Sequence, residues 1–344
     1  MPIAKKIDET IAMLKKRLRA EESFDLIYRT MTIGGKGACL FFIDGLVKDE
    51  VMEKIMEFFY SAKPEDVTDA HSFVKSSVPY IEVALSDDEG LICTNILSGI
   101  LVLVVDGFDK AISIDVRTYP QRDSSEPDRD KVIGSRDGFV ETLVANTALI
   151  RRRIRNPSLT MKILSVGSLS KTDVVLCYMD DHVDHALLNR LLKKIQDAPV
   201  ESLTMNQQSL MEAMHRPRWY NPFPKFKYTE RPDTAAASVL EGNIVILVDN
   251  SPSAVIVPTS IFDIIEEADD YYFPPITGTY LRLSRYLISL FTLVVTPLWL
   301  LALQNPQWVP ELFQFTVQIE EPVYIPIFWQ LILLEIAIDG LRLA

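Results

Sequence analysis

ACLFFIDGLVKDEVMEKIMEFF, residues 38–59, and VVLCYMDDHVDHALLNRLLKKI, residues 174–195, follow one pattern at an offset of 136 positions. Each stretch opens with an apolar run, passes through an acidic turn, and continues with apolar residues at helical spacing. This order predicts a buried strand, a turn and an amphipathic helix. The same unit is therefore predicted twice in the chain.

A second pair of segments repeats at an offset of 143 positions. GILVLVVDGFDKAISIDV (99–116) matches GNIVILVDNSPSAVIVPT (242–259), and each reads as two apolar strands around an aspartate-centred turn. Such a pattern predicts a β-hairpin. Five aligned positions are identical, namely Gly99/Gly242, Val102/Val245, Val105/Val248, Asp106/Asp249 and Ala111/Ala254.

These matches predict an α/β fold class, with two similar α/β subdomains in a cytosolic N-terminal region followed by transmembrane α-helices. We place an amphipathic N-terminal helix in 1–24, the first subdomain in 25–135 and the second in 136–275. The second subdomain includes a proline-rich and aromatic segment, 216–233. The membrane domain starts at residue 276.

The membrane prediction rests on a long stretch without charge. No Asp, Glu, Lys or Arg occurs from Tyr286 to Pro310, and a helix over 286–305 is long enough to cross a bilayer. A second, weaker apolar segment covers 323–340. Arg282 and Arg285 precede the first span, which by the positive-inside rule places the N-terminal region in the cytosol. Because the chain stops soon after the second segment, we expect it to be part of a longer polypeptide.

Four arginines fall within five residues, at positions 151–153 and 155, near the end of RDGFVETLVANTALIRRRIRNP, residues 136–157. The whole chain of 344 residues has a net charge of −12, which argues against a nucleic-acid partner. Val140, Leu143, Thr147, Ile150 and Ile154 form an apolar stripe, which predicts an amphipathic helix beginning near Asp137. The arginines are then either a solvated basic helix end, favoured by the helix dipole, or a docking face for an acidic surface.

No motif in the sequence indicates catalysis, a cofactor or a metal site, and we expect no enzyme activity. DDHVDH (180–185) has metal-ligating residue types, but the matching turn of the first repeat is built without histidine. A helix cap is the better interpretation. IGGKG (33–37) lacks the spacing and the Lys-Ser/Thr pair of a phosphate-binding loop, so it predicts a tight turn.

Two carboxylates interrupt the second apolar segment. Glu335 and Asp339 are four residues apart and therefore share one helix face. If the segment lies within the bilayer, such groups face a helix-bundle interior or an aqueous path. If the span ends earlier, both lie in the interface. We take Glu335 and Asp339 as candidate pore or bundle-interior residues.

Three blocks resemble one family. YPQR…EP…GSRDGFVETLVANTALIRRRIRNP, then NPFPKFKYTERPD, then LEGNIVILVDNSPSAVIVP are similar in order and spacing to the A-subunit (GerA) family of bacterial spore germinant receptors. IGGKGACLFFIDGLVKDEVMEKIMEFFYSAKPEDV and SVLEGNIVILVDNSPSA resemble its stage V sporulation protein AF branch most. Asn243 and Asn250 stand where nutrient-receptor subunits more usually have Arg and Gly.

The resemblance implies a multi-pass protein of the spore inner membrane, with a cytosolic N-terminal domain, that forms a homo-oligomeric ion channel, expected to be a pentamer. Its partners would be further copies of itself, other germination membrane proteins and the lipid bilayer. A non-conducting scaffold that recruits those proteins is the alternative. The arginine-rich helix then becomes part of a candidate assembly surface, made of Arg136, Asp137, Gly138, Glu141, Asn146, Arg151, Arg152, Arg153, Glu230, Arg231 and Asp233.

Overall fold

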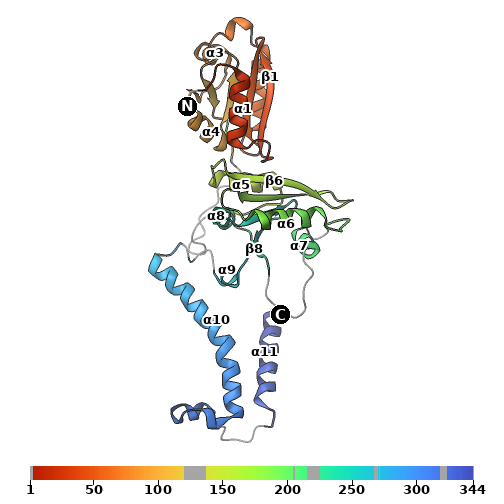
Figure 1. Cartoon of the computed structure of the whole chain (residues 1–344), viewed down its shortest axis with the longest axis vertical. Coiled ribbons are helices and arrows are strands. Elements are labelled where there is room, and N and C mark those ends of the chain that lie inside the picture. Colours follow the sequence, from red (N-terminus) through yellow and green to blue (C-terminus); the bar gives the residue numbers. More distant parts are fainter. Residues whose placement is uncertain are drawn as a thin grey trace. The chain divides into compact units, whose positions relative to one another are not determined.

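The computed structural model describes residues 3–119, 137–203, 206–214, 225–266, 270, 272–317 and 324–343. The chain divides into two compact units, Met1–Ile264 and Ile265–Ala344. The first unit contains two repeats, which we call repeat 1 (residues 3–119) and repeat 2 (residues 137–264). Figure 1 shows both repeats as mixed helix-and-strand bodies and the second unit as long helices.

Each repeat presents its elements in the same order along the chain. Repeat 1 consists of α1 (Ile7–Leu18), β1 (Leu26–Ile33), β2 (Lys36–Ile43), α2 (Asp49–Ser61), a short 3-10 turn (Pro64–Asp66), α3 (Ala70–Ser77), β3 (Val83–Ser86), α4 (Glu89–Leu97), β4 (Leu101–Val105) and β5 (Ala111–Ile114). Repeat 2 consists of α5 (Leu143–Arg153), β6 (Leu159–Val166), β7 (Thr172–Met179), α6 (His185–Gln196), α7 (Asn206–Met214), β8 (Lys227–Thr229), α8 (Pro232–Leu240), β9 (Ile244–Val248) and β10 (Ala254–Val257).

The two sheets have equivalent topologies. Their strand orders are β1-β2-β4-β5-β3 and β6-β7-β9-β10-β8, and every neighbouring pair is antiparallel. The predicted hairpins are present as β4–β5 and β9–β10. The predicted fold class, with two similar α/β subdomains, is therefore confirmed. The structure also adds α1 to repeat 1, because it is the counterpart of α5.

Both sheets are buried on both faces, which explains their almost continuous apolar strands. In repeat 1, α2 and α3 pack on one face of the sheet and α1 and α4 on the other. In repeat 2, α6 and α7 cover one face and α5 and α8 the opposite face. The three cysteines Cys39, Cys93 and Cys177 lie within these cores as buried free thiols.

The turn of each hairpin fixes the start of the first helix in its repeat. Asp106 Oδ1 accepts a hydrogen bond from Ile7 N at 3.1 Å, and Asp249 Oδ1 accepts one from Leu143 N at 3.4 Å. The next residues also correspond, because Gly107 N donates to Lys5 O and Asn250 N to Glu141 O, both at 2.9 Å. The identical aspartates seen in the sequence are thus helix-start acceptors in both repeats.

The helix predicted from Asp137 begins six residues later, at Leu143. The cause is Asn146, whose side-chain oxygen accepts from Val140 N at 2.8 Å while its amide donates to Val140 O at 2.6 Å. These bonds occupy backbone groups that a longer helix would need. Thr10 is the counterpart in repeat 1, where its hydroxyl donates to Ala4 O at 2.9 Å.

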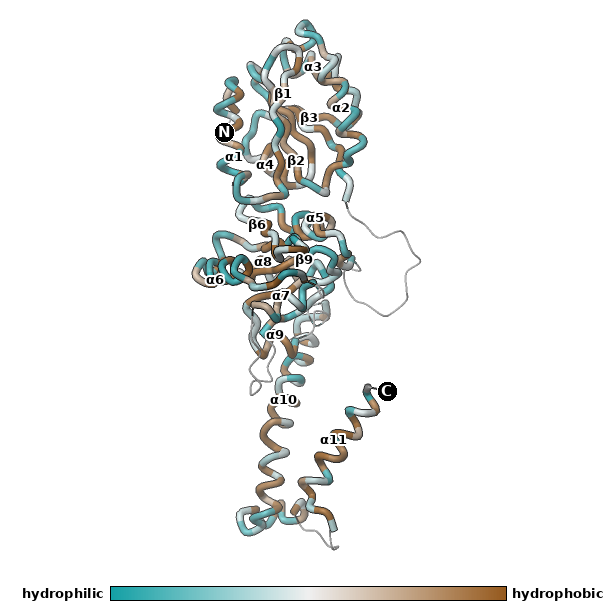
Figure 2. Tube along the Cα trace, turned by 90° about the vertical axis from the view of Figure 1, so that its right-hand side faces the viewer, coloured by the Kyte–Doolittle hydropathy of each residue, from teal (hydrophilic) through white to brown (hydrophobic). Residues whose placement is uncertain are grey.

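The second unit contains α10 (Pro275–Gln304), two short 3-10 turns (Pro306–Trp308 and Glu311–Thr316) and α11 (Ile327–Leu343), with α9 (Ile261–Ile265) preceding it. Hydrophobic residues predominate in both long helices, with hydrophilic ones toward the N-terminal end of α10 and within α11 (Figure 2). Within the described residues, α10 alone is long and apolar enough to cross a membrane, with a mean hydropathy of 2.1 over its best window and none of that window buried. The predicted span 286–305 falls almost entirely within α10.

Candidate functional site

The best-defined polar site in the first unit is the contact between the two repeats. Its centre is the ion pair of Asp25, just before β1, with Arg151 near the end of α5. Arg151 Nε lies 2.7 Å from Asp25 Oδ2 and Nη2 lies 3.0 Å from Oδ1. The side chains are 1% and 2% exposed. A planar guanidinium can bind both carboxylate oxygens in this way, which a lysine cannot do.

The remaining hydrogen bonds of the pair are also satisfied. Arg151 Nη2 donates to Ser23 Oγ and to Leu159 O, each at 3.1 Å. Ser23 Oγ in turn donates to Asp25 Oδ1 at 2.6 Å. A buried charge pair is tolerated only when such additional bonds replace the lost water. This network therefore holds both charges inside the protein.

The segment Arg19–Asp25, which joins α1 to β1, makes the other contacts. Phe24 N donates to Met161 O at 3.1 Å, and Met161 N donates to Ser23 Oγ at 3.0 Å. The Phe24 side chain packs against the core formed by α5 and α8. Arg19 Nη1 lies 2.6 Å from Asp180 Oδ2, just after β7. We call this set of contacts the joint.

A tight backbone approach lies beside the joint. A Cβ added to Gly45, which has φ +77°, would lie 2.9 Å from Val144 Cγ1 and 3.2 Å from Ala148 Cβ in α5. The guanidinium of Arg152 lies 4.4 Å from the centre of the Tyr119 ring. Repeat 1 therefore contacts α5 at several points, with a glycine where no side chain fits.

The structure brings together most residues of the predicted assembly surface, mainly through bonds within repeat 2. Arg153 Nη2 binds Asp137 Oδ2 at 2.8 Å, and Arg231 Nη2 binds Asp233 Oδ2 at 2.9 Å. Phe139 N, next to Gly138, donates to Glu230 O at 2.9 Å. Two of the sequence blocks that carry the family resemblance thus meet in space and hold the fold of repeat 2.

Not all of these residues are on a surface. Asn146 and Arg151 are each 1% exposed, so these two are internal and not part of a face that another molecule could contact. Gly138, Glu141 and Glu230 are exposed, and the other members that the structure describes are half-buried. An assembly role for these residues stays a prediction. Arg136 lies outside the described residues.

Sequence reasoning missed the partners of Arg151. Asp25 and Ser23 come from a segment more than 100 positions away in the chain, and nothing in the local pattern marks them. The burial of Arg151 did have a signal, because it follows Thr147 by four positions and so borders the apolar stripe of α5.

The acidic turn 180–185 has structural roles, as a helix cap and as part of the joint. Asp184 caps α6 by accepting from Ala186 N at 2.8 Å and Leu187 N at 3.3 Å, which confirms the predicted cap. Asp180 binds Arg19 in the joint, and the Arg19 hydrogen bond lowers the pKa of the Asp180 carboxyl. No group of three potential metal ligands occurs among the residues that the structure describes.

Glu335 and Asp339 lie on α11, one turn apart, and both are exposed in the chain as described. Their shared helix face is as the spacing predicts. In α10, Arg285 pairs with Asp270, whose side chain is 1% exposed, so this arginine is held at the N-terminal end of the apolar helix. The second span predicted at 323–340 overlaps α11, and its crossing of the membrane stays a prediction.

Comparison with known proteins places these features in one family. The sequence profile of the GerA spore germination proteins of Bacillus and Clostridium matches residues 12–344. Stage V sporulation protein AF of Bacillus subtilis is 37% identical, over 96% of this chain and 67% of that protein. Spore germination protein B1 of the same organism is 28% identical, over 87% of this chain and 62% of that protein.

A solved structure shares the fold. The N-terminal domain of the A subunit of the Bacillus megaterium spore germinant receptor GerK3 superposes with a TM-score of 0.57 at 23% identity, covering 76% of this chain and 98% of that domain. This chain spans about two thirds of the length of the two relatives named above. By the extent of the profile match and the identity to its relatives, the chain belongs to the GerA family of spore germination proteins.

Proposed function

We propose that the protein is a membrane subunit of a spore germination complex that assembles with copies of itself, as a pentamer, into an ion channel of the spore inner membrane. It acts without catalysis and with its repeats in the cytosol. The observation that carries the membrane location is α10, which is 30 residues long and has no buried residue in its most apolar window. Such a surface requires an apolar solvent.

Glu335 and Asp339 are the residues proposed to face the conducting path. A carboxylate at the centre of a bilayer costs about 2.5–3.5 kcal/mol even on the more lenient scale. Two carboxylates on one face of an apolar helix such as α11 are therefore best placed toward water or toward partner helices. In a ring of identical subunits, each position would contribute a ring of negative charge, which favours cations.

The test is cation flux through proteoliposomes that contain the protein. Glu335→Gln and Asp339→Asn should each lower the flux severalfold, because each removes one ring of charge. Glu311→Gln is the matched control, since Glu311 is an exposed carboxylate that lies outside α10 and α11. Unchanged flux in both helix variants would remove these residues from the path. The mass of the detergent-solubilised particle separately counts the subunits.

A scaffold without conduction is the second candidate. It is favoured by the match of the two repeats to a domain from the A subunit of a receptor, a name that implies further subunits in that protein. On this proposal the protein recruits other germination membrane proteins. Stable oligomers with no flux from the wild-type protein, together with copurification of those membrane proteins, would favour the scaffold over the channel.

A further inference from the structure

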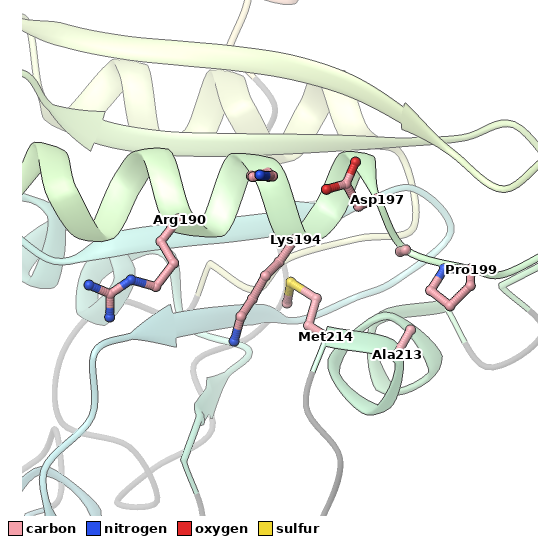
Figure 3. A pocket seen from close by; sticks show the side chains of 8 residues that line it. Arg190, Lys194, Asp197, Pro199, Ala213 and Met214 are labelled. Carbon is pink, nitrogen blue, oxygen red and sulfur yellow. The ribbon is translucent and has the colours of Figure 1, made fainter.

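The α6–α7 face of repeat 2 carries a cationic hollow that neither the fold nor the joint uses. We call it the basic groove. It has a volume of about 320 Å³ and is lined by Arg190, Lys193, Lys194, Asp197, Ala198, Pro199, Ala213 and Met214. Figure 3 shows the Arg190 and Lys194 side chains extending from the same side of α6, with Met214 of α7 close by.

The basic side chains of the groove are available to a partner molecule. The apolar residues of α6, such as Leu188 and Leu192, are buried in the core, whereas Arg190, Lys193 and Lys194 are exposed. Within the described part of the chain, no ion pair includes any of these three cations. The single acidic residue of the lining is Asp197, at the end of α6. The groove therefore has an excess of positive charge.

Comparison with repeat 1 shows that the fold does not require these cations. The counterpart of α6 is α2, which carries Asp49, Glu50, Glu53 and Glu57 with Lys54 as its one basic residue, and has no basic residue in its last turn. In α6 there is no Asp or Glu at all. Complementing the helix dipole explains Lys193 and Lys194 in part. It does not explain Arg190, or the reversal of charge between equivalent helices.

The same asymmetry extends over the repeats as a whole. Residues 3–119 contain 14 Lys or Arg against 20 Asp or Glu, whereas residues 137–264 contain 14 of each. Repeat 2 is therefore the less acidic of the two bodies, in a chain whose net charge is −12. It is also the repeat from which the chain continues to α10, with residues 258–285 between the end of β10 and the uncharged stretch.

The basic groove is not covered by repeat 1. Phe24 and the joint pack on the α5–α8 side of the repeat 2 sheet, whereas α6 and α7 lie on the opposite face. A partner can therefore reach the groove while the joint stays closed. The excess of positive charge in the lining fits an anionic partner.

We propose that the basic groove docks on the anionic phospholipid headgroups of the bilayer that α10 enters, and this inference rests on the membrane location proposed above. Phosphodiesters accept charge-assisted hydrogen bonds from Arg and Lys. The apolar side chain of Pro199, which is exposed at the groove, suits the glycerol region just below the phosphate. Each cation near an anionic surface contributes about fivefold to the docking equilibrium, and three contribute on the order of a hundredfold.

Repeat 2 is covalently linked to α10, and this link explains why three cations are sufficient for docking. Free peripheral proteins need larger clusters, because they lose translational freedom on binding. A domain attached to a membrane helix through a few tens of residues is already held near the surface at high effective concentration. Docking then sets the orientation of repeat 2 at the membrane.

Hydrogen–deuterium exchange of the whole protein in nanodiscs tests this proposal. Nanodiscs of phosphatidylcholine alone are compared with nanodiscs that also contain phosphatidylglycerol. Backbone amides of α6 and α7 should exchange more slowly in the anionic nanodiscs, and high salt should remove the difference. In Arg190→Gln/Lys193→Gln/Lys194→Gln the slowing should disappear, a loss of up to about a hundredfold in the docking equilibrium.

The matched control removes three exposed lysines from repeat 1. Lys16→Gln/Lys54→Gln/Lys75→Gln has the same net charge as the groove variant and should keep the lipid-dependent slowing. Equal slowing in the groove variant and the wild type would overturn the proposal. So would slowing by inorganic phosphate in neutral nanodiscs, which indicates a small-anion site. Slowing that depends on the number of protein copies per disc, and not on lipid charge, would assign the face to a second copy.

The same exchange data test the membrane insertion of α10 independently of the docking of the basic groove. Slow exchange of α10 in both kinds of nanodisc shows insertion, so that a lack of lipid dependence in α6 and α7 then overturns docking alone. Fast exchange of α10 would overturn the membrane location and the docking together.

Discussion

The two repeats differ in the segment between the first helix and the first strand, and this difference bears on how they are joined. In repeat 1 this segment has seven residues, 19–25, and in repeat 2 it has five, 154–158. The longer segment carries Arg19, Ser23, Phe24 and Asp25, and each of these contacts repeat 2. The shorter one supplies only the Asn156 carbonyl to Arg151. The longer connection of repeat 1 thus supplies the central contacts that join the two repeats, and Gly45 and Tyr119 add further contacts with α5.

Removing the charge at the centre of the joint should have the largest effect. Arg151→Ala leaves Asp25 buried without its cation and should lower the free energy of unfolding of the first unit by about 3–5 kcal/mol. Arg152→Ala is the neighbouring control, because Arg152 is half-buried against Tyr119 and its loss should cost about 1 kcal/mol or less. Chemical unfolding of the detergent-solubilised protein, followed by circular dichroism, measures both.

A double variant sharpens this prediction. Asp25→Leu/Arg151→Met removes both charges and should recover much of the lost stability, since the penalty comes from an unpaired buried charge. If Arg151→Ala proves as stable as Arg152→Ala, the ion pair does not hold the two repeats together.

The close approach at Gly45 should give the next largest effect. Gly45→Ala places a Cβ within 2.9 Å of Val144 at a backbone φ of +77°, so the contact between the repeats must open or shift. We expect a loss of about 2–3 kcal/mol. Gly35→Ala is the matched control, because Gly35 has φ +82° but nothing within 4 Å of the added Cβ. Gly35→Ala therefore measures the backbone strain without a steric clash. Equal losses of stability in the two variants would mean that the close contact of Gly45 with α5 has no energetic role.

The pair at the edge of the joint should give the smallest effect, and one that depends on pH. The hydrogen bond from Arg19 lowers the pKa of Asp180 from its ordinary value of 3.8. The stabilisation is therefore fully present above the unfolded-state pKa and is lost as the pH falls through the folded-state pKa. Asp180→Asn should cost about 0.5–1 kcal/mol at neutral pH, since both groups are partly exposed.

Unfolding measured as a function of pH distinguishes this from a pH-independent packing effect. The stability difference between wild type and Asp180→Asn should shrink in acid. Asp181→Asn is the control, since Asp181 is half exposed and pairs with the neighbouring His182 and not with repeat 1. A difference for Asp180→Asn that stays constant down to acid pH would contradict a role for the carboxylate charge.

The comparison of the repeats also shows how far the sequence could predict this protein. The hairpins and the strand–turn–helix units were predictable, because their apolar runs are long and recur at fixed offsets. The short edge strands β3 and β8 were not, since four and three residues carry too little periodic pattern. The start of α5 was misplaced because Asn146 bonds backward to Val140, a side-chain choice that periodicity does not express.

The joint was largely beyond prediction for a different reason. Its central partners come from distant parts of the chain, and a run of arginines resembles a solvated helix end. One arginine of the four, Arg151, is buried because the fold places Asp25 opposite it. The shared helix face of Glu335 and Asp339 on α11, in contrast, could be predicted from their spacing alone.

The order of synthesis determines when the central ion pair of the joint can form. Asp25 and Arg151 are 126 positions apart, so the ribosome completes every strand of repeat 1 before it makes the cation that Asp25 requires. At about 5–20 residues per second, the carboxylate waits for roughly 6–25 s. During that time Asp25 has no arginine partner, so the joint can close only after α5 has been made. The last step in joining the two repeats therefore follows the synthesis of every strand of repeat 1.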